Sequence, residues 1–154
     1  MFARLRFETL QSGLVLFWAI WLTLVALTNL LDGVRHVGLL PNDFSFASYN
    51  FDLVTKTVGT QGVPPAVAAV LFAGVVVWEL IASALFWRAW AAMRRGRSGT
   101  AAEVTEAFVV SLALWASFLI ATEATVSYAT AATHKETLIA QLATLLVVRL
   151  EARV

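Results

Sequence analysis

One acidic residue lies inside a long apolar run of this sequence. The run GVVVWELIASALFW covers residues 74–87, and Glu79 is its only charged residue. An ionised carboxylate at the centre of a membrane helix costs on the order of 3 kcal/mol, so such residues face protein or water rather than lipid. We expect Glu79 to be protonated, because a low-dielectric surrounding disfavours the charged form. Ser83 follows one helical turn later and shares the same helix face.

The carboxyl of Glu79 has two interpretations. In the first it is functional and relays protons, binds an ion or contacts a ligand. In the second it is a neutral packing group that hydrogen-bonds to another helix. The candidate partners within this chain are Thr28, Asn29 and Thr122, and a neighbouring subunit is the alternative source.

A second acid, Glu123, lies late in another apolar segment, in the stretch LIATEATVSY. Thr122, Thr125 and Ser127 surround it, and small polar residues of this kind suit close helix packing. We treat Glu123 as a second intramembrane polar candidate, at a different depth from Glu79.

A metal clip is one interpretation of the stretch TNLLDGVRH, which begins at Thr28. If the helix continues past Gly33, Asp32 and His36 are four residues apart on one face and could bind copper or zinc together with His134. In the alternative, the helix ends at Asp32 and Gly33, and His36 is an ordinary interfacial residue. Asn29 and Asp32 are polar candidates in either case.

Other cofactor chemistry has little support in the residues. Haem held by two histidines needs both imidazoles inside the spans, whereas both histidines here are predicted at span ends. The chain has no cysteine, which excludes disulfides and thiolate metal sites. No nucleotide-binding loop or basic nucleic-acid stripe is present. We therefore predict no cofactor and no nucleic-acid partner, with copper or zinc as the alternative.

A group of arginines follows the Glu79 segment. Arg94, Arg95 and Arg97 could bind anionic lipid headgroups. The alternative is that they only reflect the excess of basic residues on the cytoplasmic side of membrane proteins.

These residues must be positioned by membrane helices. The chain has 154 residues, of which 60% are hydrophobic and 14% charged, whereas soluble proteins are about a quarter charged. Four apolar segments, at about 13–31, 65–90, 103–128 and 134–152, approach the roughly 20 residues of a membrane span. We predict an all-α polytopic membrane protein, a single four-transmembrane-helix up-down bundle over residues 1–154, with one long external loop at 32–64. The first span exceeds a signal-peptide core, so we expect an uncleaved anchor.

The fourth segment carries the weakest signal. Its apolar centre runs from Leu138 to Val148, and Thr133 with Glu136 fits a capping box that starts a helix at His134. A helix lying in the plane of the membrane surface is the alternative to a span.

The basic residues predict the orientation. Eight arginines lie on the side of the two termini and three basic residues lie on the opposite side. Because cytoplasmic loops carry the excess of basic residues, we expect a multi-pass protein of the cell (cytoplasmic) membrane with both termini in the cytoplasm.

The order of these elements resembles an uncharacterised bacterial family of predicted small four-span integral membrane proteins, a domain of unknown function. The resemblance rests on ALTNLLD at the end of the first span, on the mid-span acid Glu79 and on the late acid Glu123. The turn YATAATHKE differs from the family, which tends to have tryptophans there. The resemblance implies the fold and the relevance of Asn29, Asp32, Glu79 and Glu123, but no activity.

Three functions follow from these features. The first is a non-catalytic accessory or structural subunit of a larger membrane complex, respiratory or oxidative. The small size favours it, as do the aromatic residues of the external loop, Phe44, Phe46, Tyr49 and Phe51. The second is a proton- or ion-coupled small transporter that uses Glu79, working as a homo-oligomer. The third is an outer-leaflet metal-binding protein that uses Asp32, His36 and His134. Membrane lipids and other subunits are the expected partners.

Overall fold

Helices are the only regular secondary structure over the residues that the computed structural model describes, 2–96 and 100–150. The helices are α1 (Phe2–His36), α2 (Asn50–Gly59), α3 (Pro65–Arg94), α4 (Thr100–Ala124) and α5 (Ala131–Arg149), with the short 3-10 helix η1 (Tyr128–Thr130) before α5. Backbone groups in an apolar solvent must bond within their own segment, and a helix achieves this. The long apolar runs of the sequence therefore become long helices.

Three of these helices are long and apolar enough to cross a membrane. They are Glu8–His36 within α1, Pro65–Arg94 and Thr100–Ala124. This confirms, by length and composition, three helices that could cross a membrane at the first three predicted spans. The shorter and more polar α5 is not among them, so a fourth span stays a prediction.

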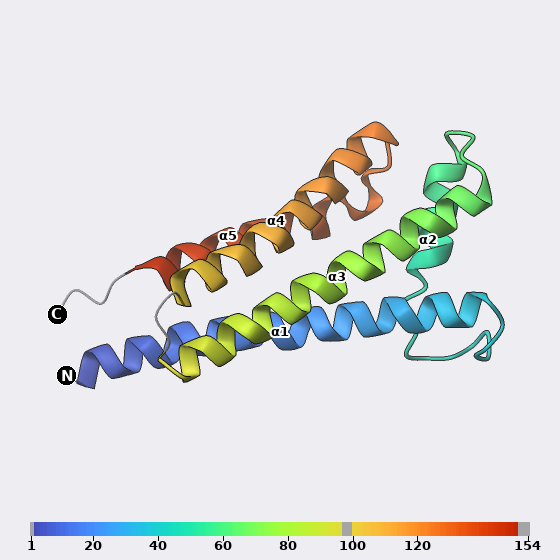
Figure 1. Cartoon of the computed structure of the whole chain (residues 1–154). Coiled ribbons are helices and arrows are strands. Elements are labelled where there is room, and N and C mark those ends of the chain that lie inside the picture. Colours follow the sequence, from blue (N-terminus) through green and yellow to red (C-terminus); the bar gives the residue numbers. More distant parts are fainter. Residues whose placement is uncertain (1, 97–99, 151–154) are drawn as a thin grey trace.

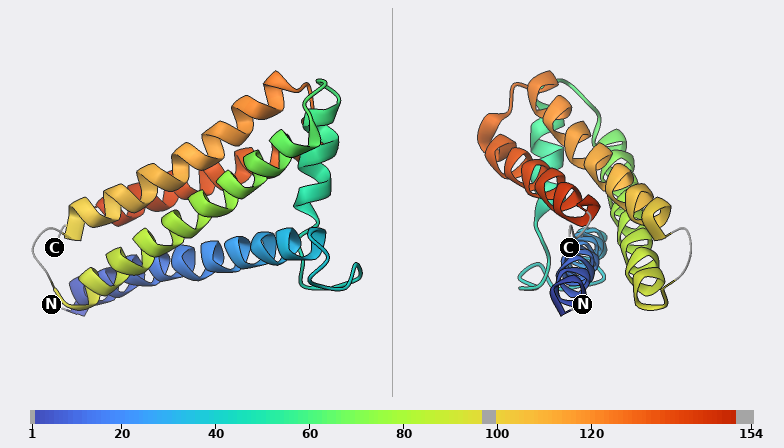
Figure 2. Two further views of the ribbon diagram at one scale, coloured as in Figure 1. Left: turned by 45° about the vertical axis from the view of Figure 1, so that its right-hand side comes forward. Right: turned by 90° about the vertical axis from the view of Figure 1, so that its left-hand side faces the viewer.

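The long helices form an antiparallel bundle (Figures 1 and 2). α1 packs chiefly on α3, α3 on α4, and α4 on α5. α1 begins and α5 ends at the same end of the bundle. At the opposite end α1 and α3 diverge, and α2 runs across from one to the other (Figure 2, left).

Small residues allow the helices to approach closely in the core. Ala19 of α1, Ala82 and Ala89 of α3, and Ala107 of α4 are all fully buried in one cluster. Large side chains fill the space between these contacts, among them the rings of Phe86 and Phe108, which meet edge to face. Close backbone approach at small residues is the usual way in which membrane helices associate.

The end of α1 differs from one of the sequence interpretations. The helix does not stop at Gly33 but continues to His36. The turn that follows contains Gly38, whose φ of +79° glycine adopts without steric cost. The N–H of Leu39 bonds the carbonyl of Val34 and the N–H of Gly38 bonds that of Arg35, the Schellman pattern of a helix C-terminus.

Two other boundaries also correct the sequence prediction. The connection at 32–64 is not a loop throughout, because it contains the last turn of α1 and the ten residues of α2. The predicted capping box is wrong, since α5 begins at Ala131 after Thr130 rather than at His134. We call residues 37–60, which comprise the loop after α1 and helix α2, the crossing segment.

Candidate functional site

Glu79 has a hydrogen-bond partner within the chain. The Nδ2 of Asn29 donates to both carboxyl oxygens of Glu79, at 2.8 and 2.9 Å. Both side chains are buried, with exposed fractions of 3% for Asn29 and 1% for Glu79. Asn29 was one of three partners that the sequence suggested. Because the partner is internal, the bond ties the middle of α3 to α1.

The same asparagine also connects to the crossing segment. The Nδ2 of Asn50, the first residue of α2, donates to the Oδ1 of Asn29 at 2.8 Å. A row of three side chains therefore joins α3, α1 and α2. This row ends at Asn50, which is exposed.

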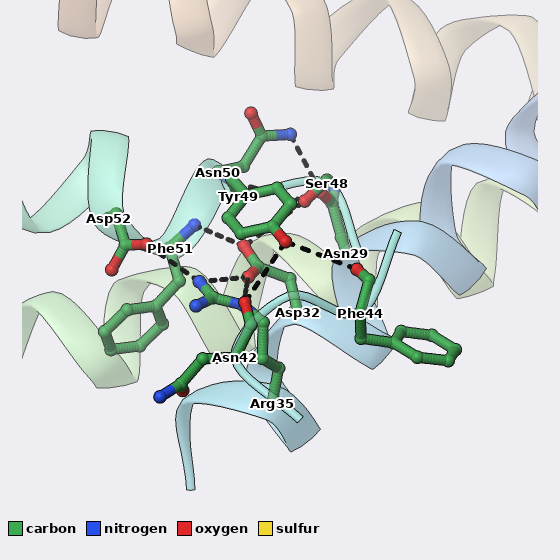
Figure 3. A network of polar contacts seen from close by, with 10 residues as sticks. All are labelled: Asn29, Asp32, Arg35, Asn42, Phe44, Ser48, Tyr49, Asn50, Phe51 and Asp52. Carbon is green, nitrogen blue, oxygen red and sulfur yellow. Dashed lines mark hydrogen bonds and ion pairs between the residues drawn. The ribbon is translucent and has the colours of Figure 1, made fainter. Parts of the chain in front are cut away.

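Asp32 is the centre of a second set of bonds, one turn further along α1 (Figure 3). Its Oδ1 accepts from Nε and Nη2 of Arg35, at 3.0 and 2.8 Å. Its Oδ2 accepts from the backbone N–H of Phe51 at 2.7 Å and from Oγ of Ser48 at 3.3 Å. The carboxylate is fully buried, and each of its two oxygens accepts two bonds.

The bond to Phe51 gives Asp32 the role of a helix cap. The residue before α2, Tyr49, makes no side-chain cap bond of its own. The first N–H groups of a helix need acceptors, and a negative charge there is favourable to the helix dipole. Asp32 supplies both the acceptor and the negative charge from a different helix, α1. Its bond to Phe51 therefore holds the start of α2 against α1.

Arg35 completes the cluster. Its Nη2 also bonds Oδ2 of Asp52 in α2 at 2.7 Å, and its guanidinium lies over the Tyr49 ring, 4.4 Å from the ring centroid. The Tyr49 hydroxyl in turn donates to the backbone carbonyls of Asn42 and Phe44 (Figure 3). The arginine therefore links α1, α2 and the loop between them.

The two histidines lie in different surroundings. His36 stacks on Phe51, with ring centroids 3.7 Å apart. His134, in α5, packs against Trp115 and Phe118 of α4. Among the described residues no three His, Cys, Asp or Glu side chains are grouped for a metal ion.

The remaining polar candidates lie outside these bonds. Ser83 shares the buried face of Glu79, but its hydroxyl pairs with Thr23 of α1 at 2.8 Å. Glu123 is exposed near the end of α4 and is 3.4 Å from the Tyr128 hydroxyl. Thr122 bonds a carbonyl of its own helix.

The predicted arginine cluster lies at the end of the bundle where α3 ends, and the structure describes only part of it. Arg88 forms an ion pair with Glu106. Arg94, the last residue of α3, and Arg95, which follows it, are both exposed. Arg97 lies outside the described residues. The lipid-headgroup interpretation of these arginines stays a prediction.

Sequence reasoning missed the contribution of the crossing segment. Ser48, Tyr49, Asn50 and Asp52 all join the cluster around α1. One signal was available, since Asp32 and Arg35 are opposite charges three residues apart, a spacing that pairs on a helix. No local signal connects either of them with α2.

The fold and these contacts define an all-helical membrane-bundle protein whose buried polar groups join the crossing segment to α1 and α3. Comparison with known proteins found no matching family model, curated protein or solved structure.

Proposed function

We propose that this protein is a non-catalytic accessory subunit of a larger membrane complex. The observation that carries the proposal is the use of its buried polar groups. Glu79, Asn29, Asp32 and Arg35 all bond within the chain, and the result of these bonds is a fixed position for the crossing segment. A transporter would need its coupling acid to exchange partners, whereas Glu79 contacts an asparagine that is itself bonded to α2.

The fixed segment has the surface of a docking site. Leu39 and Phe46, in the loop after α1, have exposed fractions of 75% and 46%. Val37 and Leu53 are exposed as well. Apolar side chains held on a rigid, extramembrane part of a protein mark an interaction surface. The partner that fits is another membrane protein with an apolar surface at the same level.

The proposal includes the predicted topology. The 19 residues of α5 give a length of about 28 Å, close to the roughly 30 Å hydrocarbon thickness of a bilayer. The side chain of Gln11 in α1 donates to the carbonyls of Val148 and Leu150 at the end of α5. These bonds join α1 to the end of α5 and support a fourth span with both termini on one side of the membrane. The excess of arginines on that side supports the cytoplasm, with the crossing segment on the external side.

Site-specific photocrosslinking in native membranes tests the proposal. A photoreactive amino acid at Leu39 or Phe46 should yield a discrete crosslinked protein larger than the 16.8 kDa chain, which mild detergent extraction also recovers. The matched control is the same amino acid at Leu24, an exposed apolar residue of α1, where we expect crosslinks to lipid. A solitary monomer after extraction, or crosslinks only to a second copy of this chain, would contradict the proposal.

A further inference from the structure

Three side chains form a row that leads from the middle of α3 to the surface of the protein. The Nδ2 of Asn29 donates to both carboxyl oxygens of Glu79, and the Oδ1 of the same amide accepts from Nδ2 of Asn50 (Figure 3). Glu79 and Asn29 are buried, whereas Asn50 is exposed. The amide of Asn29 therefore has its donor side on the acid and its acceptor side on the start of α2.

The bonds of Glu79 are those of an ionised carboxyl. An ionised carboxylate only accepts hydrogen bonds, whereas a protonated carboxyl also carries one O–H donor. In the structure both oxygens of Glu79 accept from the same amide nitrogen, so neither is placed to donate. A proton on Glu79 needs an acceptor, and the acceptor that its bonded partner offers is the Oδ1 of Asn29, which already serves Asn50.

No fixed positive charge on the helices around Glu79 balances its ionised form. Residues 15–31 of α1 and 107–122 of α4 contain no ionisable side chain, and Glu79 is the only one in residues 65–87 of α3. Beyond these ranges, the ionisable side chains at the α2 end of the bundle bond each other or are exposed: Asp32, Arg35, His36, Asp52 and Lys56. A proton is therefore the means by which the charge of Glu79 is neutralised.

We propose that this row is a proton-operated switch that acts on the start of α2. When Glu79 takes up a proton from water, one of its oxygens becomes a hydroxyl, and no other covalent bond changes. The hydroxyl donates to Oδ1 of Asn29, the amide turns this oxygen toward α3, and Asn50 loses its acceptor. Asp32 still bonds the N–H of Phe51, so the first turn of α2 loosens without detaching. The proposal is independent of the accessory role, because it concerns this chain alone.

The test is hydrogen exchange in α2, measured by mass spectrometry on the full-length protein in phosphatidylcholine nanodiscs. Exchange reports the local opening of a segment, once the rates are corrected for the direct effect of pH on exchange. Between about pH 9 and about pH 5 we expect opening of α2 to become roughly three- to tenfold more frequent, the range that the loss of one hydrogen bond gives. Difference infrared spectra over the same range should show the carbonyl stretch of a protonated carboxyl, and Glu79→Gln should lack it.

Two variants remove the response in different ways. Glu79→Gln is neutral and carries both a donor and an acceptor at every pH, so α2 should exchange at the faster rate throughout. Asn50→Ala removes the outer end of the row, and α2 should again exchange faster with no dependence on pH. Because Asn50 is exposed, this variant tests the proposal even where Glu79→Gln does not fold.

Two control variants should keep the response. Ser83 lies on the same buried face as Glu79 and bonds α1 separately, so Ser83→Ala removes a neighbouring polar group without touching the row. His36 stacks on Phe51 of α2, and histidine ordinarily changes its charge near neutral pH, so His36→Phe excludes that source. Exchange that does not change with pH, a response that survives in Glu79→Gln or Asn50→Ala, or one that is lost in His36→Phe would overturn the proposal.

Discussion

At the scale of residues, the fully buried Asp32 accepts more hydrogen bonds than its neighbour Asp52. Asp32 holds Arg35, the N–H of Phe51 and the hydroxyl of Ser48. Asp52 bonds Arg35 alone, and its side chain is 59% exposed. A charge left without its partner in a buried place is costly, whereas an exposed ion pair contributes little. The two aspartates therefore offer a matched comparison.

We predict that Asp32→Asn lowers the Tm of the purified protein by roughly 5–10 °C, because the arginine loses its buried counter-charge and α2 loses its anionic cap. Asp52→Asn should lower it by less than about 3 °C. Thermal unfolding in detergent measures both, and hydrogen exchange should show loss of protection in α2 for Asp32→Asn. Equal effects of the two substitutions would mean that Asp32 is not the centre of the cluster.

At the scale of elements, two glycines near the end of α1 differ in their backbone conformation. Gly33 lies within the helix, and a Cβ there would meet Cε1 of Phe72 at 3.6 Å, an ordinary contact. Gly38 lies in the turn just after the helix and has a positive φ of 79°, where a side chain is strained. The helix passes the first glycine because the residues on either side of it, Asp32 and Arg35, bond each other within the same turn.

We predict that Gly33→Ala stabilises the protein by about 0.5–1 kcal/mol, since alanine favours a helix interior more than glycine does. Gly38→Ala should destabilise it by roughly 1–2 kcal/mol through the strained backbone. Reversible unfolding with denaturant, applied to both variants, gives the two changes in free energy. A loss of stability in Gly33→Ala would show that the contact with Phe72 is tighter than the helix tolerates.

At the scale of the whole molecule, the question is whether α5 crosses the membrane. α4 packs along α5, and the first part of α1 meets the end of α5 where Gln11 bonds the carbonyls of Val148 and Leu150. A span places the two ends of α5 on opposite sides of the bilayer. A helix in the plane of the surface places both ends on one side. Since the sequence contains no cysteine, a single introduced thiol reports its own location.

We predict that Thr60→Cys and Lys135→Cys react with a membrane-impermeant maleimide on intact cells. Arg95→Cys and Leu150→Cys should react only after permeabilisation. All four positions are exposed, so burial does not account for a difference. Reaction of Lys135→Cys and Leu150→Cys from the same side would exclude α5 as a span.

The sequence by itself determined the three long membrane helices and the need of Glu79 for a partner. Both follow from local composition, because a run of about 20 apolar residues must become a helix in lipid and an acid within it must be paired. The tertiary structure decided that the partner is Asn29, fifty residues away, and that α1 continues past Gly33. It also decided that Asp32 caps α2, nineteen residues further on. These bonds depend on which helix faces meet, and residues so far apart in the chain carry no local signal of their contact.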